Sequence, residues 1–396
     1  MATNGVNDAM QFMQAATLLN GIVNQATGKI NSTAVDTRTF ITQAQTALLT
    51  GYDPLINAIS QVLSKTLFSI RPYQAKFTGL MRDGVQWGNH VRKINFGASG
   101  VEDDERLPLT DGSSVDMMKV KKPAVLQTNF YSADTYQNHY TIFRDQLNTA
   151  FSGPDEFMRF MSGITTEVSN KLEQYRENFA RTTLCNLIGA TKAAGRVRHL
   201  VTEYATMMGF EDDNHQVDTS AVLTTYLDGF CKWMFAELKT LSDRFTERSL
   251  LYQSNITGYD ILRHVPKDRQ RLYIYGPFLA QIDARVLSAV FNPQYLQLGD
   301  REEVTFWQSI NSPDTIKIQP SVIGSNGVYS PDATTQTITP VLGILMDYEA
   351  AGITQVNEWS APTPFNPAGG YSNVFYHVSM RGWNDMTEKA VVLLLD

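Results

Sequence analysis

The sequence predicts an α+β protein built around one long helix, with a long β-hairpin before the helix and a mixed lobe after it. Residues 154–188 repeat apolar side chains at helical spacing, whereas 91–96 and 115–131 alternate like two strands, and strand-like runs return after residue 341. The chain has 396 residues, of which 43% are hydrophobic, so we expect a substantial core and either two or three domains or one body with long insertions.

The N-terminal part carries less apolar surface than the rest. Residues 1–50 are rich in Thr, Asn, Gln and Ala and show only a weak helical stripe. A stronger helical pattern follows in YDPLINAISQVLSKTLF, where Asp53 before Pro54 is typical of a helix start. Because this part has too few apolar residues for a core of its own, we expect an extended arm that needs a partner surface.

A long charged turn joins the two strand-like segments. The stretch GASGVEDDERLPLTDGSSVD, residues 97–116, carries four consecutive acids, then a proline, then a glycine-serine turn. The segments on either side of it are predicted to pair as one hairpin. An isolated hairpin is only marginally stable in water. We therefore expect this one to lie on its own body or on a neighbouring molecule.

The clearest predicted element is a helix that begins at Pro154. Proline at the first position, followed by Asp155 and Glu156 in the first turn, is typical of a helix start. Apolar residues then recur every three or four positions as far as residue 188, which predicts a helix roughly 50 Å long. Few globular helices reach this length. We expect it to act as a spine that spans more than one local core.

Two opposite-charge pairs follow the helical repeat. Glu167 precedes Lys171, and Glu177 precedes Arg181, by four positions, the spacing at which side chains become neighbours on a helix surface. Lys, Arg and Glu are mostly found on solvated faces. We therefore predict both pairs on the solvent side of the helix.

A mixed lobe follows the polar connection GFEDDNHQVDTS. Residues 222–245 have a helical apolar pattern, 271–291 read as a strand, a Gly-Pro turn and a helix, and 304–310 and 314–322 read as strands. Near the end, LGILMDYEA and NVFYHVSMRGW are predicted strands, separated by the Pro- and Gly-rich loop SAPTPFNPAGG. The final run, AVVLLL, is predicted as a buried strand.

Composition excludes several classes of protein. The formal net charge is −7 and no basic block occurs, so sequence-specific DNA binding is disfavoured. The two cysteines, Cys185 and Cys231, lie in apolar helical patterns, and we expect both to be buried and reduced. The N-terminus has no signal-peptide pattern, and no apolar run is long enough to span a bilayer. We expect a protein made and kept in a cytoplasm.

No cluster of catalytic or metal-binding type stands out. The best metal candidate is Asp212, Asp213, His215 and Asp218, but polar residues that satisfy their own turn explain this pattern better. The four acids of the charged turn lack the spacing of an EF-hand loop. Neither a phosphate-binding glycine loop nor a nucleophile elbow occurs, and Cys185 lies in an apolar pattern rather than an electropositive one. We predict no catalytic residue, no cofactor and no metal ion, and hence no enzyme.

Three aromatic residues lie in segments that read as loops: Trp87, Trp359 and Phe365. Aromatic side chains under loops commonly serve ordinary packing. They are also enriched at the centre of subunit contacts. Both interpretations remain open from the sequence.

The order of the parts resembles the major capsid protein of tailed bacteriophages, which has the HK ninety-seven type fold. Local motifs carry the likeness: LGILMDYEAAG is similar to a late strand and turn of that family, and NVFYHVSMRGWNDMTEKAVVLLLD to its last two strands. YIYGPFLAQIDARV resembles the strand, turn and helix of its A-domain. The run FRDQLNTAF, of the form F-R-D-x-L-x-x-A-F, is most similar to short-tailed phages related to phi twenty-nine.

The resemblance implies a division of the chain and a function. It assigns residues 1–80 to an N-terminal arm, 81–140 to an E-loop hairpin, 141–215 to a P-domain with the spine helix, 216–340 to an A-domain, and 341–396 to strands that return to both domains. It implies a subunit that forms hexamers and pentamers of an icosahedral head. A scaffolding protein and a portal are implied partners, with double-stranded DNA in the lumen held without specific binding, and no membrane.

The implied location is the virion capsid, after synthesis in the host cytoplasm. Alternatives are an encapsulin-type compartment subunit of the same fold, a tail-tube protein, which the long spine argues against, and a cytoplasmic enzyme whose hairpin is a lid. The implied contact residues lie mainly on the E-loop: Trp87, Glu102, Asp103, Asp104, Glu105, Arg106, Lys121 and Lys122, with Trp359 and Phe365 as a second candidate contact loop.

Overall fold

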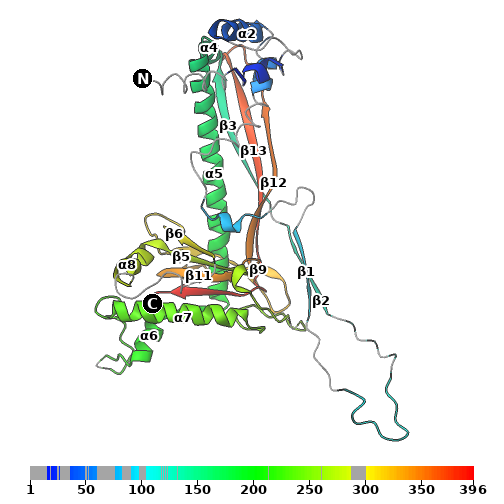
Figure 1. The fold of residues 1–396 in the computed structure, drawn as a ribbon, viewed down its shortest axis with the longest axis vertical. Coiled ribbons are helices and arrows are strands. Elements are labelled where there is room, and N and C mark those ends of the chain that lie inside the picture. Colours follow the sequence, from blue (N-terminus) through cyan, green and yellow to red (C-terminus); the bar gives the residue numbers. More distant parts are fainter. Residues whose placement is uncertain are drawn as a thin grey trace.

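The computed structural model describes most of the chain. The described residues are 16–17, 19–24, 26, 36–49, 51, 53–59, 76–82, 91–97, 104–116, 118, 120, 122, 124–131, 133–212, 214–259, 261–286 and 300–396. They form an elongated molecule with a long helix and a long sheet at one end, a mixed lobe at the other, and a hairpin that projects sideways from the lobe end (Figure 1). None of the helices within these ranges has the length and apolar character needed to cross a membrane.

The spine helix α5 runs from Pro154 to Ala193, 40 residues, which corresponds to about 60 Å at 1.5 Å per residue. It begins where the sequence predicts, with proline in the first turn followed by Asp155 and Glu156. It ends five residues beyond the predicted end at 188, just before Gly195, whose φ of +70° suits glycine. A short helix, α4 (Arg144–Ala150), precedes it.

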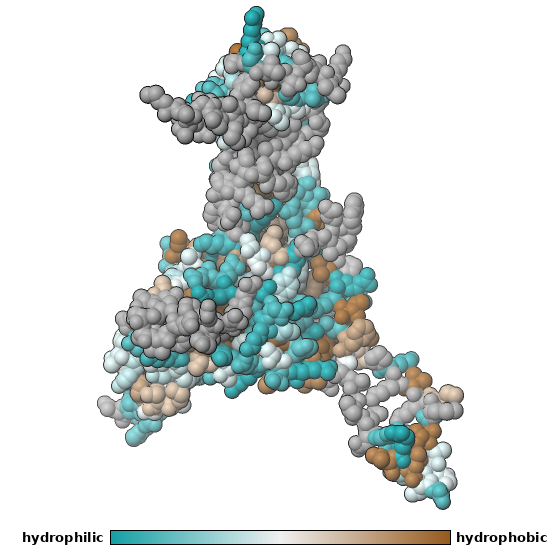
Figure 2. Space-filling model, viewed as in Figure 1, coloured by the Kyte–Doolittle hydropathy of each residue, from teal (hydrophilic) through white to brown (hydrophobic). Residues whose placement is uncertain are grey.

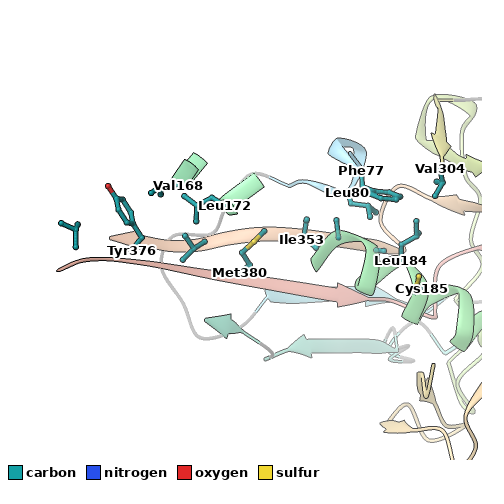
Figure 3. Packing of buried hydrophobic residues seen from close by; sticks show 14 of the residues in the cluster. Phe77, Leu80, Val168, Leu172, Leu184, Cys185, Val304, Ile353, Tyr376 and Met380 are labelled. Atoms are coloured by element: carbon teal, nitrogen blue, oxygen red, sulfur yellow. The ribbon is translucent and has the colours of Figure 1, made fainter. Parts of the chain in front are cut away.

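A three-stranded antiparallel sheet lies along the spine. Its order is β12 (Ala351–Pro362), β13 (Tyr371–Asn384) and β3 (Asp134–Phe143). β13 alternates strictly between half-buried and buried residues over most of its length, because one of its faces lies against the helix. Figure 3 shows Tyr376 and Met380 of that face beside Val168 and Leu172 of α5.

Two features of this sheet differ from the prediction. β3 belongs to the sheet rather than to the hairpin, so the structural hairpin ends before the predicted limit at residue 140. β12 was not predicted as a strand, because its sequence ITQVNEWS lacks regular alternation, and the register shifts between Gln355 and Asn357. The loop-like context predicted for Trp359 is therefore wrong, since Trp359 lies within β12.

The lobe contains a five-stranded sheet whose central strand is buried throughout. Its order is β4 (Val197–His199), β14 (Ala390–Leu394), β11 (Val341–Asp347), β5 (Gln270–Tyr275) and β6 (Asp300–Val304). All seven residues of β11 are buried, as are all five of β14, which confirms the predicted buried strand at the C-terminal end. Both faces of the sheet are covered.

The two faces of that sheet belong to different cores. Ile344 of β11 packs in the cluster that contains the spine residues, such as Leu184. Leu345, its neighbour in the chain, packs in a second cluster with Phe230 and Met234 of α7. The helices of this second side include α6 (Leu200–Met208) and α7 (Leu227–Thr246). The sheet therefore joins the spine core to the lobe core.

The remaining lobe elements are short. A helix α8 (Gly276–Val286) follows β5 directly, so the predicted Gly-Pro turn is the start of a helix. The prediction of a strand over residues 304–310 is wrong, because β6 ends at Val304. Beyond β6, the indole N–H of the buried Trp307 donates to Val341 O at 3.0 Å. The small strand pairs are β7 (Ile316–Ile318) with β10 (Gln336–Ile338), and β8 (Ser321–Ile323) with β9 (Tyr329–Pro331).

The described part of the leader packs against its own chain. α2 (Thr37–Leu49) lies near the end of the molecule where α5 begins (Figure 1). The ring of Phe40 meets that of Phe157 on α5 edge to face, with 5.8 Å between centroids. Leu55 and Ile59, in helical residues 53–59, are buried in the same core. The expectation that the leader needs a partner surface is wrong for these residues, because the N-terminal end of the spine supplies that surface.

The two ion pairs on the spine lie in different surroundings. Lys171 and Glu167 pair at 2.9 Å with side chains 48% and 64% exposed. Arg181 and Glu177 pair at 2.6 Å with side chains only 7% and 8% exposed. The prediction of a solvent-side position is confirmed for the first pair and wrong for the second.

Segments far away in the sequence cover the second pair. The backbone N–H of Lys76 donates to Glu177 Oε2 at 3.4 Å. Arg181 donates to the carbonyl oxygen of Phe306 and places its guanidinium 3.8 Å from the centroid of that ring. The ring of Phe77 lies 4.9 Å from the same guanidinium. The charges are therefore shielded by residues that precede the hairpin and by the loop after β6.

Candidate functional site

The hairpin consists of β1 (Val91–Phe96) and β2 (Val125–Phe130), paired antiparallel with Phe96 opposite Val125. Gly97 N donates to Ala124 O at 2.7 Å and closes the strand pair at its outer end. Beyond that point the chain continues into a long loop that extends away from the rest of the molecule (Figure 1). The predicted hairpin is confirmed in its position, although its paired strands are shorter than expected.

One face of the hairpin directs apolar side chains into solvent. Ile94 is 49% exposed and Phe96 66% exposed, and Val125, which pairs with Phe96, is 46% exposed. The alternate residues point the other way: Asn95 is only 6% exposed, and the side chain of Lys93 is 17% exposed. Since successive residues of a strand face opposite sides, Lys93 and Asn95 face the body while Ile94 and Phe96 face outward, on the same side as Arg92. A strand with one solvated face normally has the reverse arrangement.

The loop beyond the strands adds more exposed apolar side chains. Leu107 is 85% exposed, Met118 76% and Val120 78%. In Figure 2, brown hydrophobic atoms at the tip of this loop lie next to teal hydrophilic ones. Contiguous exposed apolar groups with a polar rim are typical of interaction surfaces. We name the apolar side chains of the strands and loop the hairpin surface; its described members are Ile94, Phe96, Leu107, Leu109, Val115, Met118, Val120 and Val125.

The acidic tip is partly neutralised within its own turn. Asp104 accepts hydrogen bonds from the Arg106 side chain, through Nε at 2.9 Å, and from its backbone N–H at 3.0 Å. These bonds hold the pKa of Asp104 below its usual range. Glu105 and Lys122 are exposed. The other predicted contacts on the hairpin, Trp87, Glu102, Asp103 and Lys121, lie outside the described residues.

The second predicted contact pair lies apart from the hairpin strands, on the long sheet and the loop that follows β12. Trp359 is 49% exposed and stacks on His377 of β13 with 4.0 Å between ring centroids. Phe365 is half-buried, and its backbone N–H donates to Asp53 Oδ1 at 2.6 Å. The structure therefore does not bring these two residues together with the hairpin surface.

The segment before the hairpin is fixed to both halves of the molecule. Arg82 N donates to Ile353 O at 2.9 Å, and the Arg82 side chain donates to Ala351 O at 3.2 Å and to Tyr348 O. Its guanidinium lies 3.3 Å from the centroid of the Tyr348 ring. On the lobe side, the backbone N–H of Phe77 donates to Glu302 of β6. The chain is therefore anchored at residues 77–82, ahead of the hairpin.

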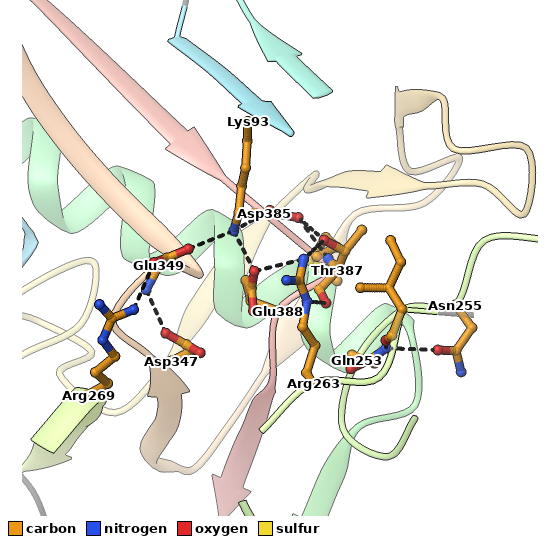
Figure 4. A network of polar contacts seen from close by, with 12 residues as sticks. Lys93, Gln253, Asn255, Arg263, Arg269, Asp347, Glu349, Asp385, Thr387 and Glu388 are labelled. Atoms are coloured by element: carbon orange, nitrogen blue, oxygen red, sulfur yellow. Dashed lines mark hydrogen bonds and ion pairs between the residues drawn. The ribbon is translucent and has the colours of Figure 1, made fainter. Parts of the chain in front are cut away.

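A lysine on β1 reaches into the body from the inward face of the hairpin. Figure 4 shows Lys93 directed toward three carboxylates, those of Glu349, Asp385 and Glu388. The sequence analysis did not single out these residues. Alternation in VRKINF places Lys93 on the face opposite Ile94 and Phe96, but the sequence does not say which face meets the body. The partners of Lys93 lie far away, up to 295 positions later in the chain.

The candidate reactive and metal-binding residues named from the sequence have structural surroundings in the described part of the chain. Both cysteines are free and buried, as predicted, and burial raises the pKa of the Cys185 thiol to about 12, which disfavours a reactive thiolate. Asp212 serves its own turn, accepting from the backbone N–H groups of Asn214 and Gln216 at 2.8 Å each. Within the described ranges, no group of three or more His, Cys, Asp or Glu side chains is placed to hold a metal ion.

One large hollow of the described part lies on the spine rather than under the hairpin. It is an open groove of about 790 Å³ between β3, α4 and α5, with Tyr140, Phe160 and Ile164 among its lining residues. No residue of β1, β2 or the loop between them contributes to it. The hairpin therefore does not act as a lid over this groove.

Comparison with known proteins agrees with this architecture. The chain is similar to a chain of the capsid of Staphylococcus phage Andhra, with a TM-score of 0.51 and 8% identity, over 83% of this chain and 86% of that one. It is equally similar to a chain in the structure of the head fiber and inner core protein gp22 of native bacteriophage P68, with a TM-score of 0.52, 8% identity and the same coverage. These likenesses support the fold alone. No curated protein sequence matches the chain.

The sequence itself carries a family signal. Residues 19–394 match the family described as Phi29-like phage major capsid protein, which is nearly the whole chain. This match agrees with the fold and favours a tailed-phage capsid over an encapsulin compartment. The chain therefore belongs to the Phi29-like phage major capsid protein family.

Proposed function

We propose that the hairpin is the arm through which one copy of this capsid protein holds the next, with the hairpin surface covered by the neighbouring copy. Membership of a major capsid protein family means that the chain assembles with itself into the shell of a virion. The contact through which it does so is the subject of the proposal. Heterologous contacts of this kind close into rings when the rotation between copies allows it.

The observation that carries the proposal is the reversed alternation over residues 93–96 of β1. Ile94 and Phe96 are exposed, whereas Lys93 and Asn95 face the body. Burying a side chain such as Phe or Ile is worth about 1.5–3 kcal/mol. Because these side chains stay exposed in the single subunit, their burial free energy is gained only when a partner covers them. In a shell, every subunit has a second copy of the chain beside it that can be this partner.

The wider arrangement follows the family resemblance. We infer that the rings are hexamers and pentamers that close an icosahedral head around double-stranded DNA, with a scaffolding protein and a portal as partners and synthesis in the host cytoplasm. The net charge of −7 supports a wall that does not bind the packaged DNA specifically. The chain then acts by geometry rather than by catalysis.

The apolar face can be tested by a double substitution. Ile94→Asp with Phe96→Asp should leave the subunit folded, because both side chains are exposed and surface changes usually alter stability by less than about 0.5 kcal/mol. Particle formation should require at least about tenfold more protein, since the lost burial exceeds 1.4 kcal/mol per contact. Light scattering over a concentration series, with negative-stain microscopy, measures the threshold.

A lobe variant supplies the matched control. Leu251 is 63% exposed and Ile310 75% exposed, and both lie outside the hairpin, so Leu251→Asp with Ile310→Asp introduces the same two charges at comparably exposed apolar positions. We expect it to assemble like the unmodified protein. An unchanged threshold in the hairpin variant, or an equal loss of assembly in the lobe variant, would argue against a specific role for the hairpin face.

The acidic tip offers a second, weaker test. Replacing Glu102, Asp103, Asp104 and Glu105 by Lys should leave the circular dichroism spectrum unchanged and reduce the yield of particles. The effect should be smaller than that of the apolar substitutions, because Asp104 is already paired with Arg106 and exposed charges are screened by salt. Particles formed at the normal yield would show that the tip does not dock through its charge.

A further inference from the structure

Lys93 enters a cluster of acids at the point where the two sheets of the molecule are joined. Asp385 and Glu388 lie in the turn between β13 of the long sheet and β14 of the lobe sheet. Glu349 lies in the turn between β11 of the lobe sheet and β12 of the long sheet. One hairpin side chain therefore contacts both crossings between the sheets (Figure 4).

The contacts are close, and most of the charges are buried. Lys93 Nζ lies 2.9 Å from Asp385 Oδ2 and 3.2 Å from Glu349 Oε2, and it donates to Glu388 Oε1. The side chains of Asp385 and Glu388 are 0% and 3% exposed, whereas that of Glu349 is 44% exposed. An ion pair buried to this degree is screened far less by salt than a surface pair.

The acids are held in position by the body without help from the hairpin. Asp385 Oδ1 accepts from the hydroxyl of Thr387 at 2.6 Å and from its backbone N–H at 2.9 Å. Glu388 pairs with Arg263 at 2.9 Å, and Glu349 pairs with Arg269 at 3.0 Å. The receiving site is therefore preformed, and only the lysine comes from the hairpin.

We propose that Lys93 is a positioning residue: together with Asp385, Glu388 and Glu349 it forms a latch that fixes the direction of the hairpin relative to the two sheets. The consequence for the shell rests on the function proposed above, because the direction of the hairpin decides where the hairpin surface meets the next copy. The latch itself is a property of the single subunit. Without this cation, the hairpin loses its ion pairs to the junction, and its direction relative to the two sheets is no longer fixed.

The charges around Lys93 give the latch a pH dependence of known sign. Burial raises the pKa of Glu388 above its ordinary value, although Lys93 and Arg263 oppose this. Burial also acts to raise the pKa of Asp385, but Lys93 and Thr387 more than offset it, and the net pKa is lowered. The charged and titratable groups that face Lys93 or its partners are Glu349, Asp385, Glu388, Asp347, Arg263, Arg269 and Tyr329.

Acidification therefore weakens the latch in two stages. Glu388 takes up a proton first, above the ordinary glutamate value of 4.5, and one partner of Lys93 becomes neutral. Asp385, with its lowered pKa, keeps its charge until the pH falls below the ordinary aspartate value of 3.8. Burial opposes the charge of Lys93, but Asp385 and Glu388 more than offset this and raise its pKa, so Lys93 stays charged over the whole acid range. The hairpin should loosen as the pH falls through the first window.

Spin labels on the unassembled subunit measure the direction of the hairpin. Gln127→Cys on β2 and Lys239→Cys on α7 place labels at exposed positions on the hairpin and the lobe, while the two native cysteines are buried. Distance distributions from double electron–electron resonance should be narrow near neutral pH. In Lys93→Gln the distribution should roughly double in width or shift, and Lys93→Arg should restore the narrow form.

The neighbouring outward-facing residue provides a matched control. Arg92 is exposed on the opposite face of β1, so Arg92→Gln should keep the narrow distribution. A folded Lys93→Gln protein whose distribution is as narrow as that of the Arg92 variant overturns the proposal. These measurements are made on single subunits, so that result would not contradict the proposed contact between copies through the hairpin surface. Likewise, a failure of shell assembly would not contradict the latch.

A second variant covers the possibility that Lys93→Gln fails to fold, because it leaves buried carboxylates without their cation. Lys93→Gln combined with Asp385→Asn removes one charge of each sign, and the distribution should again broaden. Acid titration of the labelled unmodified protein should broaden the distribution as Glu388 protonates, whereas Glu388→Gln should remove this first step. An unbroadened double variant, or a pH profile unaffected by Glu388→Gln, overturns the latch.

Discussion

Arg181→Met should destabilise the subunit by about 3–5 kcal/mol, because it leaves the carboxylate of Glu177 buried without its cation. Glu177 is 8% exposed and pairs with Arg181 at 2.6 Å. The substitution also removes the hydrogen bond to Phe306 O and the guanidinium that lies against the rings of Phe306 and Phe77. Chemical denaturation of the unassembled subunit measures the loss as a lower midpoint.

The spine provides a control with the same charges and spacing, although its cation is a lysine. Lys171→Met breaks the Glu167 pair, which is also four residues apart but about half exposed. Exposed pairs of this kind contribute about 0.3–0.5 kcal/mol, so the midpoint should hardly move. If both substitutions lowered the denaturation midpoint equally, burial would not explain the contribution of the Glu177–Arg181 pair to the free energy of unfolding.

Gly343→Ala should destabilise the lobe sheet by about 3 kcal/mol, since overpacking in a rigid core is costly. Gly343 lies in β11 between β14 and β5. A Cβ atom there would lie 2.4 Å from the backbone oxygen of Tyr273 and 3.3 Å from Cα of Ile274. Both obstacles are backbone atoms of the adjacent strand, so no side chain can turn aside to make room.

The same substitution elsewhere should have the opposite sign. Gly163 lies within α5, and nothing lies within 4 Å of the Cβ position that alanine would fill. Gly163→Ala should therefore stabilise the subunit by about 0.5–1 kcal/mol through the helix propensity of alanine. Thermal unfolding of the two variants side by side measures the contrast. If Gly343→Ala is neutral, β11 and β5 can separate more easily than their registered pairing implies.

Much of the fold could be predicted because its signals are local. Pro154, Asp155 and Glu156 mark the start of the spine wherever the helix packs, and AVVLLL is too apolar to be anything but buried. The hairpin could be located for the same reason, since two alternating segments surround a turn of acids, glycine and serine. β12 was missed because its register shift near Gln355 breaks the alternation that identifies a strand.

The candidate site was predictable only in outline. The sequence placed the contact on the hairpin and emphasised its acids, whereas the described part of the hairpin presents Phe96, Leu107 and Met118 to solvent. The pattern of a strand gives two faces but does not say which one meets the body. The sequence therefore could not predict which face of β1 contacts the body, nor that Lys93 lies on that face.

The sequence by itself determined what depends on neighbouring residues: the long helix, the alternating strands, the turn between them and the order of parts that marks a capsid protein. Tertiary structure alone decided which charges are buried. Glu167 with Lys171 and Glu177 with Arg181 have the same spacing on one helix, yet only the second pair is covered, by residues 76–77 and 306. The physical reason is that a helix repeat fixes the positions of side chains relative to one another, whereas solvent exposure depends on chain segments that arrive from elsewhere.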